Sequence, residues 1–159
     1  MADDPFGGRQ LSAFVWIQHL ANSLATYPRV LDRGYSTQFS LYLRDVYYPT
    51  INLGMAIVGQ NGSADLYAAG APFQPGAAWF SAGWRYDGSR VDLFVNGIRG
   101  STASAPYGPI ARHVGNMRIG QRIDGSLNRG AVGNVACLIV DNVAWPDSAF
   151  SELHTATYG

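Results

Sequence analysis

The sequence predicts an all-β protein, an antiparallel β-sandwich with one short C-terminal helix. Apolar and polar residues alternate with a period of two along much of the chain, which is typical of strands. Dipeptides that favour tight hairpin turns separate the alternating runs. The chain also has 19 glycines in 159 residues, a share that suits a fold with many turns. The turn dipeptides are Asn61-Gly62, Asp87-Gly88, Asn96-Gly97 and Asp124-Gly125.

The clearest strand lies within residues 90–97. Val91, Leu93 and Val95 point to one face of it, which we expect to be core, and the residues between them point to the other. Residues 11–25 fit both an alternating strand and a helical stripe, and we favour a strand followed by a loop. Further strands, spaced as in an antiparallel sandwich or jelly roll, are predicted at residues 12–18, 29–33, 38–44, 51–58, 64–68, 78–86, 116–120 and 134–142.

Pro146 and Asp147 mark the start of the predicted helix. The residues after them favour one or two helical turns, with the Asp147 carboxylate accepting hydrogen bonds from the first free amides. Residues 70–76 and 100–109 are rich in glycine, alanine and proline, which predicts loops. No internal repeat or linker divides the chain, so we expect one domain at residues 11–159 after an N-terminal arm of residues 1–10.

Composition argues against several classes of partner. The formal net charge is zero and the charged residues are scattered, so we expect neither nucleic acid nor a membrane as partner. The N-terminal segment has two aspartates where a secretory signal has basic residues, and no apolar run approaches the ~20 residues of a membrane span. We therefore expect a soluble chain with no signal peptide and no transmembrane segment.

The charged and aromatic residues have an unusual composition. All eleven basic residues are arginine, Glu152 is the only glutamate, and twenty residues are aromatic. Protein interfaces favour arginine and aromatic residues and contain little lysine or glutamate. The composition therefore indicates a surface covered by partner subunits. Codon bias in a GC-rich genome explains the missing lysine equally well, although it explains the missing glutamate less well.

The second half of the chain carries an ordered set of motifs. A tryptophan opens a strand, an Asp-Gly turn leads to a strand that ends in Asn-Gly, an Ile-Gly pair closes a later strand, and a Glu-Leu pair lies in the terminal helix. These positions are Trp79, Asp87, Gly88, Asn96, Gly97, Ile119, Gly120, Glu152 and Leu153. The pattern resembles the laminin-G-like, concanavalin A-like jelly-roll family over roughly residues 11–159. The resemblance implies a concanavalin A-like jelly roll.

Two features depart from that family. Ala136 stands where the family has an aspartate in its late strand, so the resemblance implies no calcium site. Few residues precede Leu11, which predicts that the sheet lacks an edge strand or borrows one. An open sheet edge is a site where a partner chain adds a strand.

The pattern of acidic residues argues against an enzyme. Glycoside hydrolysis, which some concanavalin A-like relatives perform, needs two carboxyl groups on either side of the scissile bond. Glu152 lies in the predicted helix, and Asp87 and Asp92 lie in a hairpin where turn and surface roles are commoner. Residues 34–38 begin like a nucleophile elbow but lack its closing glycine. We therefore expect a non-catalytic protein.

No metal or cofactor site is expected either. His19, His113 and His154 are far apart and have no ligand partner at zinc-site spacing. Without lysine, a Walker-type phosphate loop is not possible. We expect Cys137, which lies in an apolar run, to be a small buried side chain.

Three tyrosines are candidate binding residues. Tyr47 and Tyr48 are adjacent, so at least one is expected to face outward, and Tyr107 lies in a Pro- and Gly-rich loop. Exposed tyrosines stack on sugars and anchor protein interfaces. The alternative is a ring in the core with its hydroxyl at the rim.

Charged residues beside a turn are the other candidates. Arg85 and Arg90 flank the Asp87-Gly88 turn, where they pair with Asp92 or with a partner's carboxylates. Surface ion pairs of this kind contribute about 0–1 kcal/mol. We therefore place these arginines at the rim of an interface.

Two functions follow from the sequence. The favoured hypothesis is a structural interaction module, such as a capsid-decoration or cement protein on a virion surface, packed against a shell protein or copies of itself. The alternative is a lectin-like adhesin module that binds a glycan or receptor through loop aromatics. A phage-tail or fibre adhesin would combine both, since one fold serves many functions.

Overall fold

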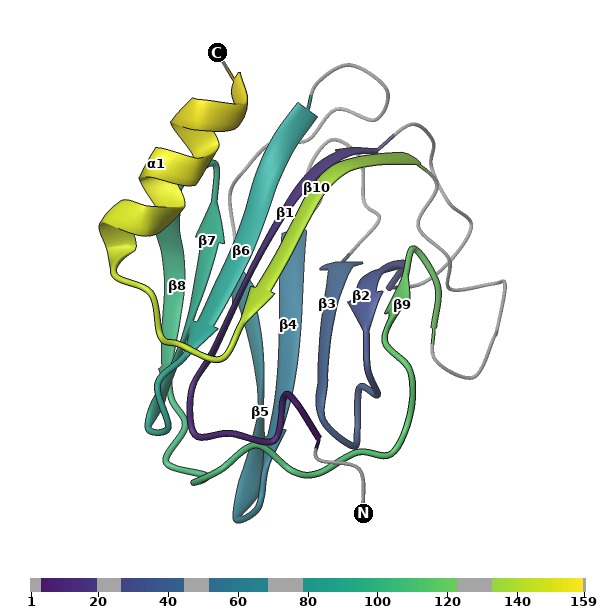
Figure 1. Ribbon diagram of the computed structural model, residues 1–159, viewed down its shortest axis with the longest axis vertical. Helices are drawn as coiled ribbons and strands as arrows, with labels where there is room; N and C mark the ends of the chain where they lie inside the picture. The colour runs from purple at the N-terminus through teal and green to yellow at the C-terminus, as the bar shows by residue number, and fades with distance from the viewer. Residues whose placement is uncertain (1–3, 20–26, 45–51, 69–78, 123–132, 159) are drawn as a thin grey trace.

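The computed structural model describes residues 4–19, 27–44, 52–68, 79–122 and 133–158. Within these ranges the chain forms two antiparallel five-stranded sheets packed face to face, which confirms the predicted all-β jelly-roll sandwich (Figure 1). Sheet A has the order β10-β1-β6-β7-β8, and sheet B has the order β5-β4-β3-β2-β9. The elements are β1 (Leu11–His19), β2 (Arg29–Asp32), β3 (Phe39–Arg44), β4 (Asn52–Gly59), β5 (Gly62–Ala68), β6 (Trp79–Tyr86), β7 (Arg90–Val95), β8 (Ile98–Ser104), β9 (Arg118–Ile119), β10 (Gly133–Asp141) and α1 (Asp147–Tyr158).

The main core lies between the sheets. Alternate residues of β1, β6 and β7 meet alternate residues of β3 and β4, and nearly all of these side chains are buried. Trp84 of sheet A is fully buried and its ring packs against Phe39 of sheet B, with centroids 5.3 Å apart. Burying one large apolar side chain of this kind contributes roughly 1.5–3 kcal/mol, and many such side chains are buried at this interface.

A second cluster covers the outer face of sheet A. Helix α1 lies along β6, β7 and β8 (Figure 1), and its Phe150 is fully buried against Phe14, Trp16 and Phe94. The rings of Phe94 and Phe150 stack with centroids 3.8 Å apart and an angle of 8° between their planes. Both faces of β7 are therefore buried. The prediction of a core on one face of this strand was correct but incomplete.

The predicted turns within the described residues are confirmed. Asn61-Gly62 lies at the β4–β5 hairpin, where Asn61 is in the turn and Gly62 begins β5, and Asp87-Gly88 joins β6 to β7. Asn96-Gly97 joins β7 to β8, with positive φ at both residues (50° and 76°), as a two-residue hairpin turn of the primed type requires. Asp124-Gly125 lies outside the described residues.

Several predicted elements differ from the structure. Residues 100–104 belong to β8 rather than to a loop, because the turn before them aligns this small, polar segment with β7 despite its weak strand propensity. Helix α1 has 12 residues, more than the one or two turns predicted, because Phe150 anchors it to sheet A. The strand expected at residues 116–120 is reduced to Arg118–Ile119. The loop predicted at residues 70–76 lies outside the described residues.

The sheet edges are formed by strands of this chain. Within the described residues, β10 and β8 are the outer strands of sheet A, while β5 and β9 are those of sheet B. The predicted addition of a partner strand at one of these edges stays a prediction. No helix of the described part of the chain has the length and apolar character of a membrane span.

Candidate functional site

A cleft of about 410 Å³ opens on the outer face of sheet B, on the opposite side of the sandwich from α1. Its volume is in the range of small-molecule binding sites. Strands β4 and β5 supply most of the lining, and the β2–β3 connection supplies the rest. The lining residues are Tyr35, Ser36, Ala56, Val58, Gly59, Gly62, Ser63 and Asp65.

Strand register places the floor of the cleft. Ala56 of β4 lies opposite Asp65 of β5, and Val58 lies opposite Ser63. Because side chains alternate along a strand, these four point away from the core, which takes the neighbouring Met55 and Ile57. The small Ala56 side chain leaves the space above it open, while Ser63 and Asp65 bring polar atoms to the edge of that space.

Tyr35 projects from the turn between β2 and β3. Gly34 has a φ of +105°, and its carbonyl accepts hydrogen bonds from the amides of Thr37 (3.1 Å) and Gln38 (2.8 Å). A Cβ at Gly34 would lie 1.8 Å from Thr37 Oγ1, so this tight turn requires glycine. The turn leaves the Tyr35 side chain 37% exposed at the wall of the cleft.

Two tyrosine hydroxyls hold the Asp65 carboxylate. Tyr35 donates to Oδ2 of Asp65, and Tyr42 of β3 donates to Oδ1. Gly54 lies opposite Tyr42 in the β3–β4 pair, and a Cβ there would be 2.3 Å from the Tyr42 ring. Glycine at this position therefore allows the Tyr42 ring to lie flat across β4 and reach Asp65.

Arg29 lies beneath the same two tyrosines. Its guanidinium carbon is 4.7 Å from the ring centroid of Tyr35 and 4.7 Å from that of Tyr42. The residue is only 2% exposed. Cation–π attraction between the guanidinium and the two rings therefore supports the tyrosines from below and fixes the wall of the cleft.

Sequence reasoning missed this site. Tyr35 lies in residues 34–38, for which the sequence predicts no function, and Arg29 and Asp65 fall within predicted strands. The available signals were an aspartate at an outward position just after the Asn61-Gly62 turn and a tyrosine after a turn glycine. Neither signal is specific, because both describe many exposed hairpins.

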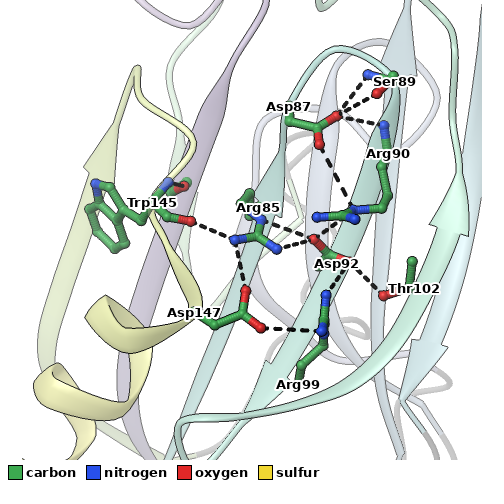
Figure 2. Close-up of polar contacts among 10 residues, drawn as sticks. Arg85, Asp87, Ser89, Arg90, Asp92, Arg99, Thr102, Trp145 and Asp147 are labelled. Carbon is green, nitrogen blue, oxygen red and sulfur yellow. Dashed lines mark hydrogen bonds and ion pairs between the residues drawn. The ribbon is translucent and has the colours of Figure 1, made fainter.

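The predicted charged residues form a separate network on sheet A (Figure 2). Asp92 is fully buried; its Oδ2 accepts from Arg85 Nε at 2.9 Å and from Arg90 Nε at 3.1 Å. Arg85 also donates to the backbone oxygen of Trp145 (2.6 Å) and pairs with Asp147 (2.9 Å). Burial lowers the pKa of Arg85, but its bonds to Asp92 and Asp147 outweigh burial and raise it overall.

This network corrects two predictions. The Arg85–Asp92 pair is not a surface pair, because the two side chains are 7% and 1% exposed beneath the segment that leads into α1. The Asp147 carboxylate, expected to accept from the first amides of the helix, instead pairs with Arg85 and Arg99 of sheet A among the described residues. Arg90 is 41% exposed, and its place at the rim of an interface stays a prediction.

The predicted tyrosines do not line the cleft within the described residues. Tyr47 and Tyr48 lie outside the described residues. Tyr107 is partly buried against the core, and a Cβ at either Gly59 or Gly62 would come within 2.6 Å of it. Tyr107 therefore packs behind the end of the β4–β5 hairpin and supports the cleft from outside it.

The remaining candidates have structural surroundings. Cys137 is a free thiol that is only partly buried against the second cluster, which is less burial than predicted. His154 Nδ1 lies 3.0 Å from Oγ of the buried Ser81, and its ring packs on Trp16. Within the described residues, no three side chains of metal-ligating type gather at one place.

Two aspartates have pKa values below the ordinary 3.8. Burial raises the pKa of Asp4, but hydrogen bonds from the amides of His113 and Phe6, the charge of Arg33 (2.9 Å) and a hydrogen bond from Gln38 outweigh it. Burial likewise raises the pKa of Asp87, and the hydrogen bonds that it accepts from Ser89 and Arg90 outweigh it.

These depressed pKa values predict acid sensitivity. Each carboxylate stabilises the fold above the unfolded pKa of 3.8, and this stabilisation is lost as pH falls through 3.8 towards the lower folded value. We expect the free energy of unfolding in urea to fall over this range, and to fall less steeply in Asp4→Asn. An equal slope in the variant and the unmodified protein would contradict the role of Asp4.

Comparison with known proteins supports the fold. No protein-family model matches the sequence, and no curated protein matches it. Among solved structures, Ruminococcus gnavus IT-sialidase CBM40 bound to α2,6 sialyllactose has a TM-score of 0.74 and 14% identity, over 93% of this chain and 84% of that one. The native heptameric SAP-like pentraxin from Limulus polyphemus has a TM-score of 0.68 and 19% identity, over 92% and 70%. The binding domain of botulinum neurotoxin serotype G has a TM-score of 0.69 and 8% identity, over 94% and 37%.

At these identities the likeness establishes the fold alone. The concanavalin A-like part of the sequence resemblance is confirmed, while none of these three structures is named as laminin G. The botulinum structure is a binding domain, and the CBM40 structure is bound to sialyllactose. The virion-surface module and its glycan-binding alternative both stay predictions at this point. This chain therefore has a concanavalin A-like jelly-roll sandwich fold.

Proposed function

We propose that this protein is a non-catalytic glycan-binding module and that the cleft on sheet B is its site. The observation that carries the proposal is the Tyr35 ring, 37% exposed over a cleft whose edge holds the Asp65 carboxylate. An aromatic face packs on the C–H groups of a sugar, while a carboxylate accepts hydrogen bonds from its hydroxyls. Ser36 and Ser63 add hydroxyl groups that both donate and accept.

Preorganisation supports the same proposal. Asp65 accepts from two phenols and Tyr35 rests on Arg29, so a ligand meets side chains that are already ordered. Binding then costs less side-chain entropy than at a site assembled from free rotamers. The named glycan complex of a domain with this fold, CBM40 with sialyllactose, supports a sugar as the class of ligand.

A blocked cleft tests the proposal. Ser63 is exposed on the edge strand β5, so Ser63→Trp would fill the cleft without entering the core. The matched control is Ser104→Trp, at an exposed serine on the edge strand β8 of the other sheet. We expect Ser63→Trp to weaken binding at least tenfold, and Ser104→Trp to leave it unchanged.

The measurement is a glycan array followed by calorimetric titration of the bound oligosaccharides. Melting temperatures of both variants verify that the fold persists. Binding that survives Ser63→Trp unchanged would place glycan recognition elsewhere, and absence of binding to every glycan would reject the function itself.

A further inference from the structure

The described N-terminal arm, residues 4–10, is attached to one end of the sandwich by a buried carboxylate (Figure 1). Asp4 Oδ1 pairs with Arg33 Nη2 at 2.9 Å. Its Oδ2 accepts from Gln38 Nε2 at 2.7 Å and from the amide of His113 at 3.0 Å. The side chains of Asp4 and Arg33 are 7% and 6% exposed, and Gln38 is fully buried. One carboxylate therefore joins the arm to the β2–β3 connection and to the β8–β9 connection, away from solvent.

Phe6 adds an apolar contact to the attachment of the arm. Its ring centroid lies 4.6 Å from the guanidinium carbon of Arg33. The same ring packs edge-on against the fully buried Phe39, with centroids 5.9 Å apart. The Phe6 amide donates to Oδ1 of Asp4 at 3.1 Å. The docked arm therefore fixes the position of Arg33 through both a charge and a ring.

The two side chains that bind Asp4 lie at the two ends of the turn that carries Tyr35. Arg33 directly follows β2, and Gln38 directly precedes β3. The residues between them bring Tyr35 and Ser36 to the wall of the cleft. Because one carboxylate contacts both ends of this turn, the docked arm fixes the distance between those ends and limits the conformations of the residues between them.

The arm is also connected to the β4 side of the cleft. The amide of Ile110 donates to the carbonyl of Gly8 at 2.9 Å, and the next amide, that of Ala111, donates to the carbonyl of Val58 at 2.9 Å. Val58 and Gly59 line the cleft, and Gly59 forms a β-bridge with Ile110. The arm therefore reaches both sides of the cleft through short chains of contacts, without lying in the cleft itself.

We propose that the N-terminal arm regulates the cleft. With Asp4 docked, the turn that carries Tyr35 is ordered and the cleft binds its glycan; with Asp4 released, the turn loses order and the glycan binds more weakly. The inference rests on the glycan-binding function proposed above. Ordering a loop in advance removes an entropic cost from the binding step. Asp4 is a positioning residue, because it acts on the cleft through Arg33 and Gln38.

Asp4→Asn tests the inference, because it keeps the size of the side chain while removing its charge and one acceptor oxygen. The matched control is Asp87→Asn. Asp87 also accepts from backbone amides, those of Ser89 and Arg90, but its turn joins β6 to β7 in sheet A. Both variants are studied at neutral pH, where the replaced carboxylates are ionised because their pKa values lie below 3.8.

Hydrogen exchange of single amides, followed by NMR, measures the order of the turn without any glycan. The amides of Thr37 and Gln38 both donate to the carbonyl of Gly34, so their exchange reports opening of the turn. We expect both to exchange at least about fivefold faster in Asp4→Asn and at an unchanged rate in Asp87→Asn. Unchanged rates in Asp4→Asn, or equal acceleration in both variants, would overturn the proposal.

Calorimetric titration measures the effect on binding. The probe is the array oligosaccharide that binds the unmodified protein most tightly. We expect its affinity to fall at least about fivefold in Asp4→Asn and to stay unchanged in Asp87→Asn.

Coupling between two sites is reciprocal, so the probe must also strengthen the docking of the arm. In the unmodified protein we expect a saturating concentration of the probe to slow exchange of the Phe6 amide, which donates to Asp4, by a similar factor. An unchanged Phe6 rate would contradict the coupling. This measurement needs no variant, so it decides the inference even if Asp4→Asn does not fold.

The outcomes separate the inference from the function beneath it. If Asp4→Asn leaves the affinity for the probe unchanged while Ser63→Trp abolishes binding, the cleft binds glycans and the regulatory inference is wrong. If Ser63→Trp leaves all binding unchanged, the proposed site fails and the inference fails with it.

Discussion

Replacing Asp92 with alanine is expected to lower the free energy of unfolding by about 3–5 kcal/mol, the loss typical of removing one partner from a buried ion pair. Asp92 is fully buried and accepts hydrogen bonds from Arg85, Arg90 and Thr102 (Figure 2). Without it, the Arg85 guanidinium stays 7% exposed and keeps, among the described residues, only the half-exposed Asp147 as a counterion. A buried charge with so little compensation destabilises the folded state.

Asp147→Ala is the matched control, because it removes a carboxylate from the same arginine. The Asp147 side chain is 47% exposed, so solvent screens its ion pair with Arg85. Solvent also screens its interaction with the dipole of α1, in whose first turn it lies. We expect a loss of about 1 kcal/mol or less. Urea unfolding of both variants measures the difference. Equal losses in the two would show that burial of Asp92 does not set the strength of its pairs.

Replacing Phe150 with alanine is expected to cost about 3–5 kcal/mol, the usual effect of truncating a buried phenylalanine. Phe150 is fully buried, stacks on Phe94 and contacts Trp145. Gly83 of β6 lies beneath it, where a Cβ would come within 2.7 Å of the ring. Alanine at this position would leave a cavity between α1 and sheet A. It would also remove the ring that anchors α1 to the sheet.

Glu152→Ala controls for changes elsewhere in α1, because Glu152 is exposed on the same helix. We expect a change within about 0.5 kcal/mol for this surface substitution. Unfolding in urea and the helical signal in circular dichroism follow both variants. A loss below about 1 kcal/mol for Phe150→Ala would mean that α1 is not anchored through this ring.

These effects concern one side of the sandwich. The network around Asp92 and the ring of Phe150 both lie on the outer face of sheet A, whereas the cleft lies on the outer face of sheet B. Asp147→Ala and Glu152→Ala should therefore leave glycan affinity unchanged. In this arrangement the face beneath α1 contributes to stability, and the face that bears the cleft is available to a ligand.

Local patterns predicted most of the fold. The alternation of side chains along residues 90–97 predicted which residues of β7 share a face. The Asn96-Gly97 dipeptide predicted a hairpin turn at the observed position. Both signals depend only on residues close in sequence. Strand β8 was missed because Gly100 and the serines around it have little strand propensity, and pairing with β7 overrides that weak preference.

The candidate site was much less predictable. Tyr35 and Asp65 are 30 residues apart in the sequence. They meet because the strand pairing of sheet B brings the β2–β3 connection, which carries Tyr35, beside the β4–β5 hairpin, which carries Asp65. Arg85 was expected at the surface because its sequence neighbours form a turn, but the segment before α1, about 60 residues later, covers it. Burial depends on contacts from distant parts of the chain, and no local pattern specifies those contacts.

The sequence by itself determined the strand-and-turn content and the resemblance to a concanavalin A-like jelly roll, because alternation and turn chemistry act over a few residues. Tertiary structure alone decided which polar residues are buried and which line a cleft. It placed Asp92 under the approach to α1 and Asp65 on an open face, although both are outward-pointing aspartates of hairpin strands. The physical reason is that a side chain's environment depends on what packs over it, which here comes from strands and a helix far away in sequence.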